Sequence, residues 1–263
     1  LPAISGALSV KKNRRAAHLT EQAIRISGII AVPCGVFLLV TGRHCIALLY
    51  GADKWSEIMS MADGSGLSLL DAASVSLAIL AFAVFFISIV STCNSLLNAY
   101  SKPHLPFIAV LIGIAVLTAS EIAILYSPLG IYAAPISSLI CYTIVMMMDI
   151  IFLRKKCGVN LKLTSMFARP VFSGLVTALF TYGTYKGACA IWLNYLGNSI
   201  DTRGASFFIL MCTGIVMVIA YFISVLVFKA IKEDEVRLLP KGNTIADKLL
   251  RLGWLKADSK IED

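Results

Sequence analysis

Long apolar stretches separated by short polar segments dominate this chain. A helix needs about 20 residues to cross the ~30 Å hydrocarbon core of a bilayer. Stretches of that length cover residues 27–50, 69–100, 107–126, 131–153, 170–193 and 205–228. The pattern predicts an all-α fold, a polytopic transmembrane helical bundle of about six membrane-spanning helices. A basic cytoplasmic segment at 1–26 precedes this lobe (27–228), and a cytoplasmic tail at 229–263 follows it.

The first stretch is the least continuous. The polar group Thr41-Gly42-Arg43-His44 follows the apolar run 26–40. We expect the helix to break or kink at this group, leaving residues 45–50 as a short turn at the membrane interface. The connection 52–68 is expected to be a polar outer loop.

Apolar residues recur every three or four positions in the tail, at Ile245, Leu249, Leu252 and Leu255. This spacing is typical of an amphipathic helix. Such a helix would lie on the inner leaflet of the membrane or pack on the protein itself.

The basic residues are distributed unequally between the two sides of the predicted topology. Of the 23 Lys and Arg residues, all but Arg43, Lys54, Lys186 and Arg203 fall on one side. The positive-inside rule makes that side cytoplasmic, so both termini are predicted to be cytoplasmic. The same bias accounts for the net charge of +8, so no nucleic-acid partner is expected.

Composition excludes a soluble or disordered protein. The chain has 58% hydrophobic and 14% charged residues, whereas soluble domains carry about 25% charged residues. Its seven Cys residues are scattered, with no CxxC pair, unlike those of a disulfide scaffold. Because the chain begins at Leu1 and shows no signal peptide, we expect it to be a piece of a longer protein.

Enzyme motifs are absent from the sequence. It contains no HExxH, GxSxG or GxxxxGK[ST] pattern, and His18, His44 and His104 are far apart. Metal ligands and phosphate-binding loops need closer and more regular spacing. We therefore expect a non-enzymatic protein with no cofactor and no metal site.

Polar residues inside the predicted spans are the main functional candidates, because such groups are costly in hydrocarbon. Glu121 lies about 7.5 Å inside the outer end of its helix. It suits a proton or cation site, a partner for a basic group, or a glutamate near the interface. Asn94 and Asn98 form a polar stripe that fits either a water-lined cavity or hydrogen bonds between helices. Asp149 is expected to pair with the basic residues 154–156.

Small residues at regular spacing predict close helix packing. Ala133, Ser137 and Cys141 recur every four residues. Gly183 and Gly187 match the GxxxG pattern, which Lys186 weakens.

One stretch carries a family resemblance. It comprises Cys93-Asn94-Ser95-Leu96-Leu97-Asn98-Ala99-Tyr100-Ser101-Lys102-Pro103, then Leu105-Pro106 and Leu111-Ile112-Gly113. It resembles polysaccharide-biosynthesis and stage V sporulation protein B-type flippases of the multidrug/oligosaccharidyl-lipid/polysaccharide exporter superfamily. The resemblance covers about residues 1–156. It departs from the family pattern at Leu117 and Glu121, where the family often has Lys and Asn.

The resemblance implies a transporter with two helical lobes that moves a lipid-linked sugar by alternating access. This chain would be the C-terminal lobe, and its partners would be the lipid bilayer, the lipid-linked sugar and a missing N-terminal lobe. Its location would be the bacterial cytoplasmic membrane. Glu121, Asn94 and Asn98 are the residues expected to line the substrate pathway.

Two other functions remain open at this point. The chain could belong to a cation-coupled multidrug exporter of the same superfamily, with Glu121 as the coupling carboxylate. It could also be a non-transporting scaffold that recruits partners in envelope synthesis through its basic tail.

Overall fold

The structure is a computed structural model that describes residues 2–10, 12–51, 58–60, 66–159, 163–196, 200 and 202–228. The amphipathic helix expected at 245–255, like the rest of the tail after Phe228, lies outside the described residues. The elements in chain order are α1 (Pro2–Ser9), α2 (Asn13–Tyr50), β1 (Ile58–Ser60), β2 (Gly66–Ser68), α3 (Leu69–Ala99), α4 (His104–Leu125), η2 (Gly130–Tyr132), α5 (Ala133–Cys157), α6 (Leu163–Ile191), η3 (Trp192–Leu196) and α7 (Arg203–Val227).

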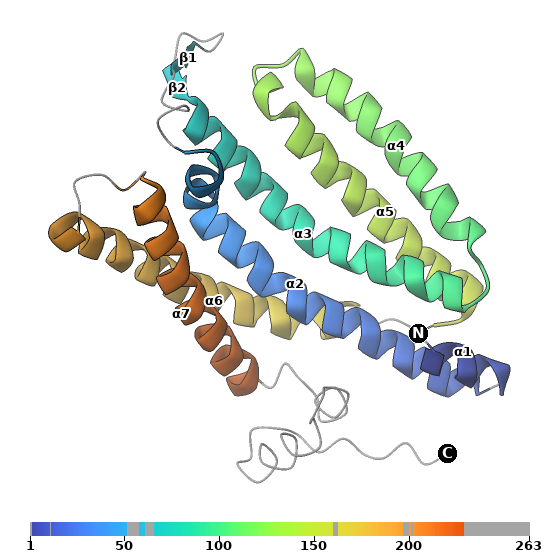
Figure 1. Ribbon diagram of the computed structural model, residues 1–263. Coiled ribbons are helices and arrows are strands. Elements are labelled where there is room, and N and C mark those ends of the chain that lie inside the picture. Colours follow the sequence, from blue (N-terminus) through green and yellow to red (C-terminus); the bar gives the residue numbers. More distant parts are fainter. Residues whose placement is uncertain are drawn as a thin grey trace.

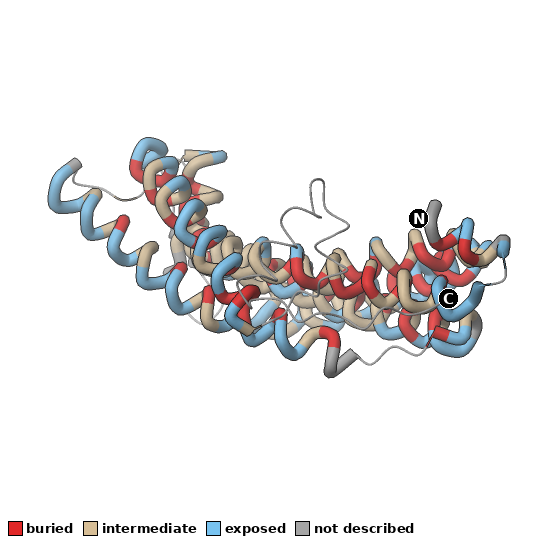
Figure 2. The backbone as a smooth tube through the Cα atoms, turned by 90° about the horizontal axis from the view of Figure 1, so that it is seen from below, coloured by how far each residue is buried: buried red, intermediate tan, exposed pale blue. Residues whose placement is uncertain are grey.

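The long helices lie side by side in the order α4, α5, α3 and α2, and α6 and α7 pack together against α2 (Figure 1). Seen from below, the backbone forms an elongated slab, with buried positions where helices meet and long exposed stretches on the outer faces (Figure 2). Large apolar side chains cover those faces, for example Phe107, Leu111 and Ile114 on α4. An apolar outer surface is what hydrocarbon solvates best, so the predicted polytopic helical bundle is confirmed.

Five helices of the described chain are long and apolar enough to span a membrane: α2, α3, α4, α7 and the segment Gly130–Lys155 that contains α5. The helix α6 has 29 residues, but Arg169, Lys186 and a run of Thr and Tyr residues make it more polar. It nevertheless packs lengthwise on α2 and α7. The expected count of about six spans thus corresponds to five strongly apolar helices and one more polar helix.

The first predicted span differs most from the structure. The helix α2 begins at Asn13, well before residue 27, and continues through 45–50, where a short turn was expected. The expectation of a turn was wrong because a bond within the helix and contacts with other helices hold the polar group in helical form. The hydroxyl of Thr41 donates to the Phe37 carbonyl at 2.7 Å, Arg43 pairs with Asp71, and His44 is fully buried.

The described parts of the connection after α2 are two short strands, where the sequence predicts a polar loop. Its strands β1 and β2 pair in antiparallel register, with Ile58 opposite Ser68 and Ser60 opposite Gly66. The second strand leads directly into α3, where the hydroxyl of Ser68 caps the helix by accepting a hydrogen bond from the Asp71 amide. A serine at this position satisfies an amide that has no partner within the helix.

The turns between α3, α4 and α5 are short. After α3, Ser101 takes a positive φ of 58°, and Pro103 and Pro106 flank or occupy the first turn of α4, where proline is tolerated. At the other end, residues 127–132 form a tight connection, so α4 and α5 are antiparallel neighbours as expected.

The interface between α2 and α3 depends on glycines spaced seven residues apart. A Cβ atom at Gly35 would lie 2.9 Å from the Ala81 carbonyl oxygen, and one at Gly42 would lie 3.4 Å from Leu77 Cδ2. Towards the other end, a Cβ atom at Gly28 would lie 2.5 Å from a ring carbon of Phe167 on α6. The absence of a side chain therefore lets the backbones approach closely at Gly35, makes room for the Phe167 ring at Gly28, and leaves ordinary contact distance to the Leu77 side chain at Gly42.

We predict that Gly35→Ala destabilises the protein by about 1–3 kcal/mol, because the new methyl group meets rigid backbone. The matched control is Gly183→Ala in α6, where an added Cβ meets nothing within 4 Å. This control should leave stability unchanged or raise it by up to about 1 kcal/mol, since alanine is the better helix former. Unfolding in detergent measures both, and equal effects of the two substitutions would contradict the close approach.

Candidate functional site

The three residues expected to line a substrate pathway do not form one cluster. Asn98 is exposed near the end of α3, and Asn94, one turn earlier, is half-buried. Glu121 is half-buried on α4, about 25 Å along that helix from the turn that joins it to α3. Because α4 packs chiefly on α5, the structure separates the carboxylate from the two amides.

The two residues of the expected polar stripe, Asn94 and Asn98, differ in how far they are buried. The side chain of Asn98 is accessible, whereas Asn94 Oδ1 is buried and has no hydrogen-bond partner among the described residues. Asn98 can therefore contact a ligand at the surface, while the amide oxygen of Asn94 is directed into the helix packing.

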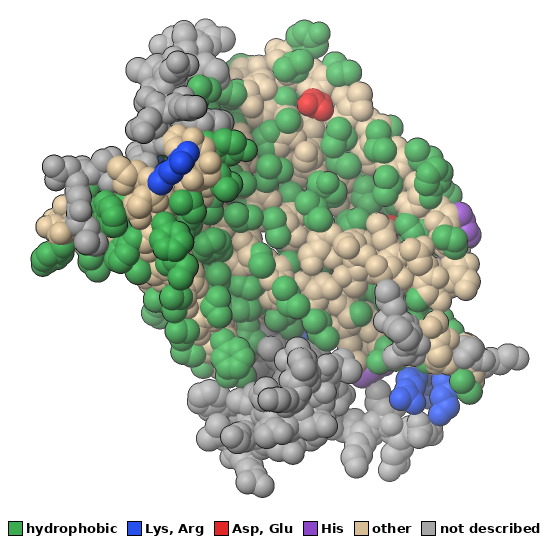
Figure 3. All heavy atoms as spheres, viewed as in Figure 1, with side chains coloured by type: hydrophobic (Ala, Val, Ile, Leu, Met, Phe, Trp, Pro, Cys, Tyr) green, Lys and Arg blue, Asp and Glu red, His purple; other side chains and the backbone are tan. Residues whose placement is uncertain are grey.

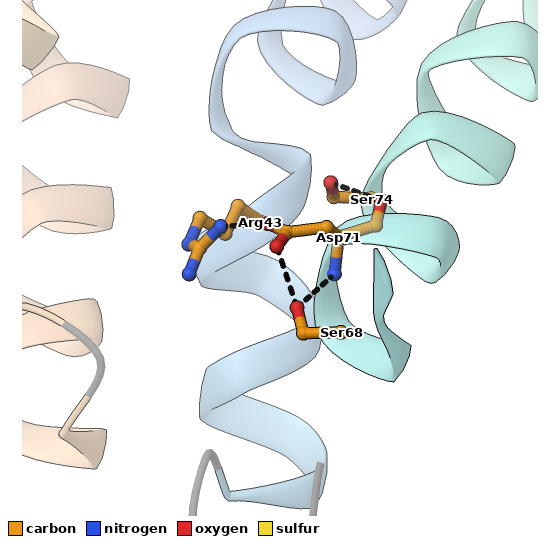
Figure 4. Close-up of polar contacts among 4 residues, drawn as sticks. All are labelled: Arg43, Ser68, Asp71 and Ser74. Carbon is orange, nitrogen blue, oxygen red and sulfur yellow. Dashed lines mark hydrogen bonds and ion pairs between the residues drawn. The ribbon is translucent and has the colours of Figure 1, made fainter. Parts of the chain in front are cut away.

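A polar cluster that the sequence pattern did not predict lies at the opposite end of the bundle, where α2 meets the start of α3 (Figure 4). Arg43 forms an ion pair with Asp71. The Ser68 hydroxyl donates to Asp71 Oδ2 at 2.5 Å and accepts from the Asp71 amide at 3.1 Å. Ser74 donates to the Asp71 carbonyl at 2.8 Å. Asp71 lies in the first turn of α3, where the helix dipole favours an acid, and its carboxylate also joins α3 to α2 through Arg43.

His44 joins α2 to α6 and α7. Its ring is fully buried, with Nδ1 3.4 Å from Ser206 Oγ and Nε2 3.9 Å from Cys189 Sγ. It also packs on the Tyr185 ring at 5.5 Å between centroids. The sequence placed His44 at a membrane edge, because no spacing signal links it to residues more than 140 positions away.

Hydroxyl pairs connect α2 to α3 along the rest of their length. Ser27 Oγ lies 2.6 Å from Thr92 Oγ1, and Ser88 donates to the Ser27 carbonyl at 3.2 Å. Thr20 Oγ1 lies 3.2 Å from the Tyr100 hydroxyl. These bonds give each hydroxyl a partner inside the protein, so we interpret them as packing contacts.

An apolar groove of about 240 Å³ opens between α2, α3 and α6. Every lining residue is Gly, Ala, Val, Leu or Phe, among them Gly35, Phe82 and Leu175. Such a groove accommodates hydrocarbon and offers nothing to a sugar hydroxyl or a phosphate. Within the described ranges, no three His, Cys, Asp or Glu side chains are arranged to hold a metal ion.

The family model "Lipid II flippase MurJ" matches residues 1–200. The chain belongs to this family. The match contains α1 to α6 and therefore includes the ion pair at Asp71 and the three candidate pathway residues. No curated protein and no solved structure matches the chain.

Membership of a flippase family agrees with the arrangement of charge on the molecule. Lys and Arg side chains are concentrated at two ends of the visible face, and apolar side chains cover the area between them (Figure 3). The chain is thus a multi-pass membrane protein of a lipid-linked precursor flippase family. Its polar groups lie at the ends of the helices or between them.

We predict that the Arg43–Asp71 pair contributes only modestly to stability. The two side chains are 34% and 44% exposed, and pairs of that exposure are worth about 0.2–1 kcal/mol. Asp71→Ala should cost more than Arg43→Ala, because it also removes the acceptor for the Ser68 hydroxyl and the acidic group at the helix start. A double-mutant cycle on unfolding in detergent measures the coupling; equal costs for the two substitutions would contradict this account.

Proposed function

We propose that the chain is the C-terminal lobe of a flippase that moves a lipid-linked oligosaccharide or polysaccharide precursor across a bacterial cytoplasmic membrane. The observation that carries the proposal is the family match over residues 1–200. The long apolar helices and the apolar groove support it, because the substrate of such a protein has a hydrocarbon part that must stay in the bilayer. We further propose that the substrate is of the kind moved by polysaccharide-biosynthesis or sporulation-type flippases.

The mechanism we propose is alternating access between this lobe and an N-terminal partner lobe. Rocking of two helical units exposes a polar path first to one side of the membrane and then to the other. The groove between α2, α3 and α6 offers no polar group to the headgroup. The headgroup would therefore follow the side chains of Asn98, Asn94 and Glu121.

We assign these residues to two levels of the path. Asn98 lies at the helix end that also carries Lys102, whereas Glu121 lies near the other end of α4. We propose that Asn98 contacts the headgroup on the cytoplasmic side, with Asn94 in the wall behind it, and that Glu121 contacts it near the outer side. The neutral amide of Asn98 would accept hydrogen bonds from sugar hydroxyls without repelling a phosphate.

The basic residues indicate which end of the bundle faces the cytoplasm in this proposal. The end of α3, the start of α4 and the end of α5 lie together at one end of the bundle (Figure 1). That end carries Lys102, Arg154 and Lys155, which the positive-inside rule places in the cytoplasm.

We predict that a single cysteine at Lys155 in a cysteine-free background reacts with a membrane-impermeant maleimide only after the membrane is permeabilised. A single cysteine at Ser127, between α4 and α5, should react with intact cells. The reverse labelling pattern would overturn the proposed orientation.

For transport, we predict that Asn98→Leu and Glu121→Gln each slow translocation of a lipid-linked sugar by the full-length parent protein in liposomes by about tenfold, equivalent to about 1.4 kcal/mol in the barrier. Thr118→Val is the matched control, because Thr118 is exposed one turn from Glu121 and its hydroxyl bonds only its own helix, at the Ile114 carbonyl. Normal transport by both variants would overturn the site assignment. Uptake of cationic dyes that collapses with an ion gradient would instead favour a multidrug exporter.

A further inference from the structure

A buried carboxyl group lies between the helices of the bundle, about one and a half turns before the basic residue Arg154 on the same helix. On α5, residues at four-residue spacing are all buried, and the row includes Ser137, Cys141, Val145 and Asp149. Asp149 is 0% exposed, and neither Oδ1 nor Oδ2 has a hydrogen-bond partner among the residues that the structure describes. Of the basic residues 154–156 with which Asp149 is expected to pair, Arg154 and Lys155 are exposed and form no hydrogen bond with it; the side chain of Lys156 lies outside the described part of the structure.

The helix facing this carboxyl group brings a second unpaired acceptor to the same level. The helices α3 and α5 pack together and run in the same direction (Figure 1). Val90 of α3 and Val145 of α5 belong to one buried cluster. Asn94 and Asp149 each lie four residues, or about one helical turn, further along the two helices. Asn94 Oδ1 is buried without a hydrogen-bond partner.

This part of the interface therefore contains three buried acceptor oxygens and no donor bonded to them. An isolated carboxylate in an apolar interior is among the most costly groups a protein can bury. Buried charges persist when they are neutralised by a proton or by a bound cation. A carboxylate and an amide oxygen are also the hard ligands that alkali cations accept.

In the described parts of α3 and α4, the long helices that pack on α5, no charged side chain is bonded to Asp149. On α3 the neighbouring titratable group is the buried thiol of Cys93. On α4 the titratable groups are His104, exposed at the helix start, and Glu121, near the other end. The α4 residue buried in the same cluster as Val145 is Ala109, which carries no charge.

We propose that Asp149 and Asn94 form a binding site for a small monovalent cation, a proton or Na⁺, in the interface between α3 and α5. A proton would turn one carboxylate oxygen into a donor for the Asn94 amide oxygen. A sodium ion would be held by both side chains together. The site is separate from Glu121, and its occupancy does not depend on which lipid-linked substrate the protein moves.

The test is thermal unfolding of the purified full chain in detergent, at pH 5 to 8, in choline chloride and in sodium chloride. In wild-type protein a bound cation should raise the Tm by about 2–4 °C at a concentration several times its Kd. A rise on acidification in choline identifies the proton, and a rise with sodium at pH 8 identifies Na⁺. Asp149→Asn should abolish either response and unfold at least as high as wild type at pH 8 in choline, because it removes an uncompensated buried charge.

Asn94→Leu should weaken the same response, whereas Ser137→Ala, in the same buried row, and Glu121→Gln should retain it. Infrared spectroscopy gives a second measurement that needs no stable variant. Wild-type protein at pH 5 should show the C=O stretch of a protonated carboxyl group, and sodium at pH 8 should shift the carboxylate bands. A wild-type Tm insensitive to both cations, with neither infrared change, would overturn the proposal. A full response in Asp149→Asn would overturn it equally. None of these measurements involves transport, so the outcome is independent of the proposed flippase function.

Discussion

The close approach of α2 and α3 is the constraint on which the rest of the bundle depends. These two helices share the largest interface, and each also contacts the next unit of the lobe, α2 with α6 and α7, and α3 with α5. The glycine at position 35 allows the two backbones to approach closely, and hydroxyl bonds such as Ser27–Thr92 then align the helices. Lipid competes with apolar side chains for every helix surface, so close packing and hydrogen bonds, more than hydrophobicity, hold such helices together.

The lipid around the helices also explains where the polar side chains lie. Thr20, Thr41, Thr177 and Thr181 donate to the carbonyl one turn earlier on their own helix, which satisfies the hydroxyl without a partner helix. Charged groups need a partner or an aqueous end, as Arg43 and Asp71 show. Asp149 has neither, and this contrast makes it the group in the described bundle that most needs a bound ion.

The parts of the fold that sequence predicts well are those that depend on local pattern. The boundaries of α3, α4 and α7 fall within a few residues of the predicted spans, and the small residues of α5 at Ala133, Ser137 and Cys141 are buried as expected. Local pattern fails where distant contacts decide. The polar group at 41–44 stays helical because its side chains meet α3, α6 and α7. Gly183 and Gly187 match a packing motif, yet a Cβ at either would meet nothing within 4 Å.

At the candidate site, too, the local sequence pattern does not predict which residues lie together. Sequence identifies Asn94, Asn98 and Glu121 as polar residues in apolar helices, but depth and facing direction depend on the packing order of the helices. Because α5 lies between α3 and the edge helix α4 (Figure 1), Glu121 is displaced from the amides sideways as well as along the helix. Polar groups at two levels of one helical bundle do not form a single headgroup site. This separation is why the proposed path needs an opposing surface, which the partner lobe of the proposed flippase would supply by closing one level while the other is open.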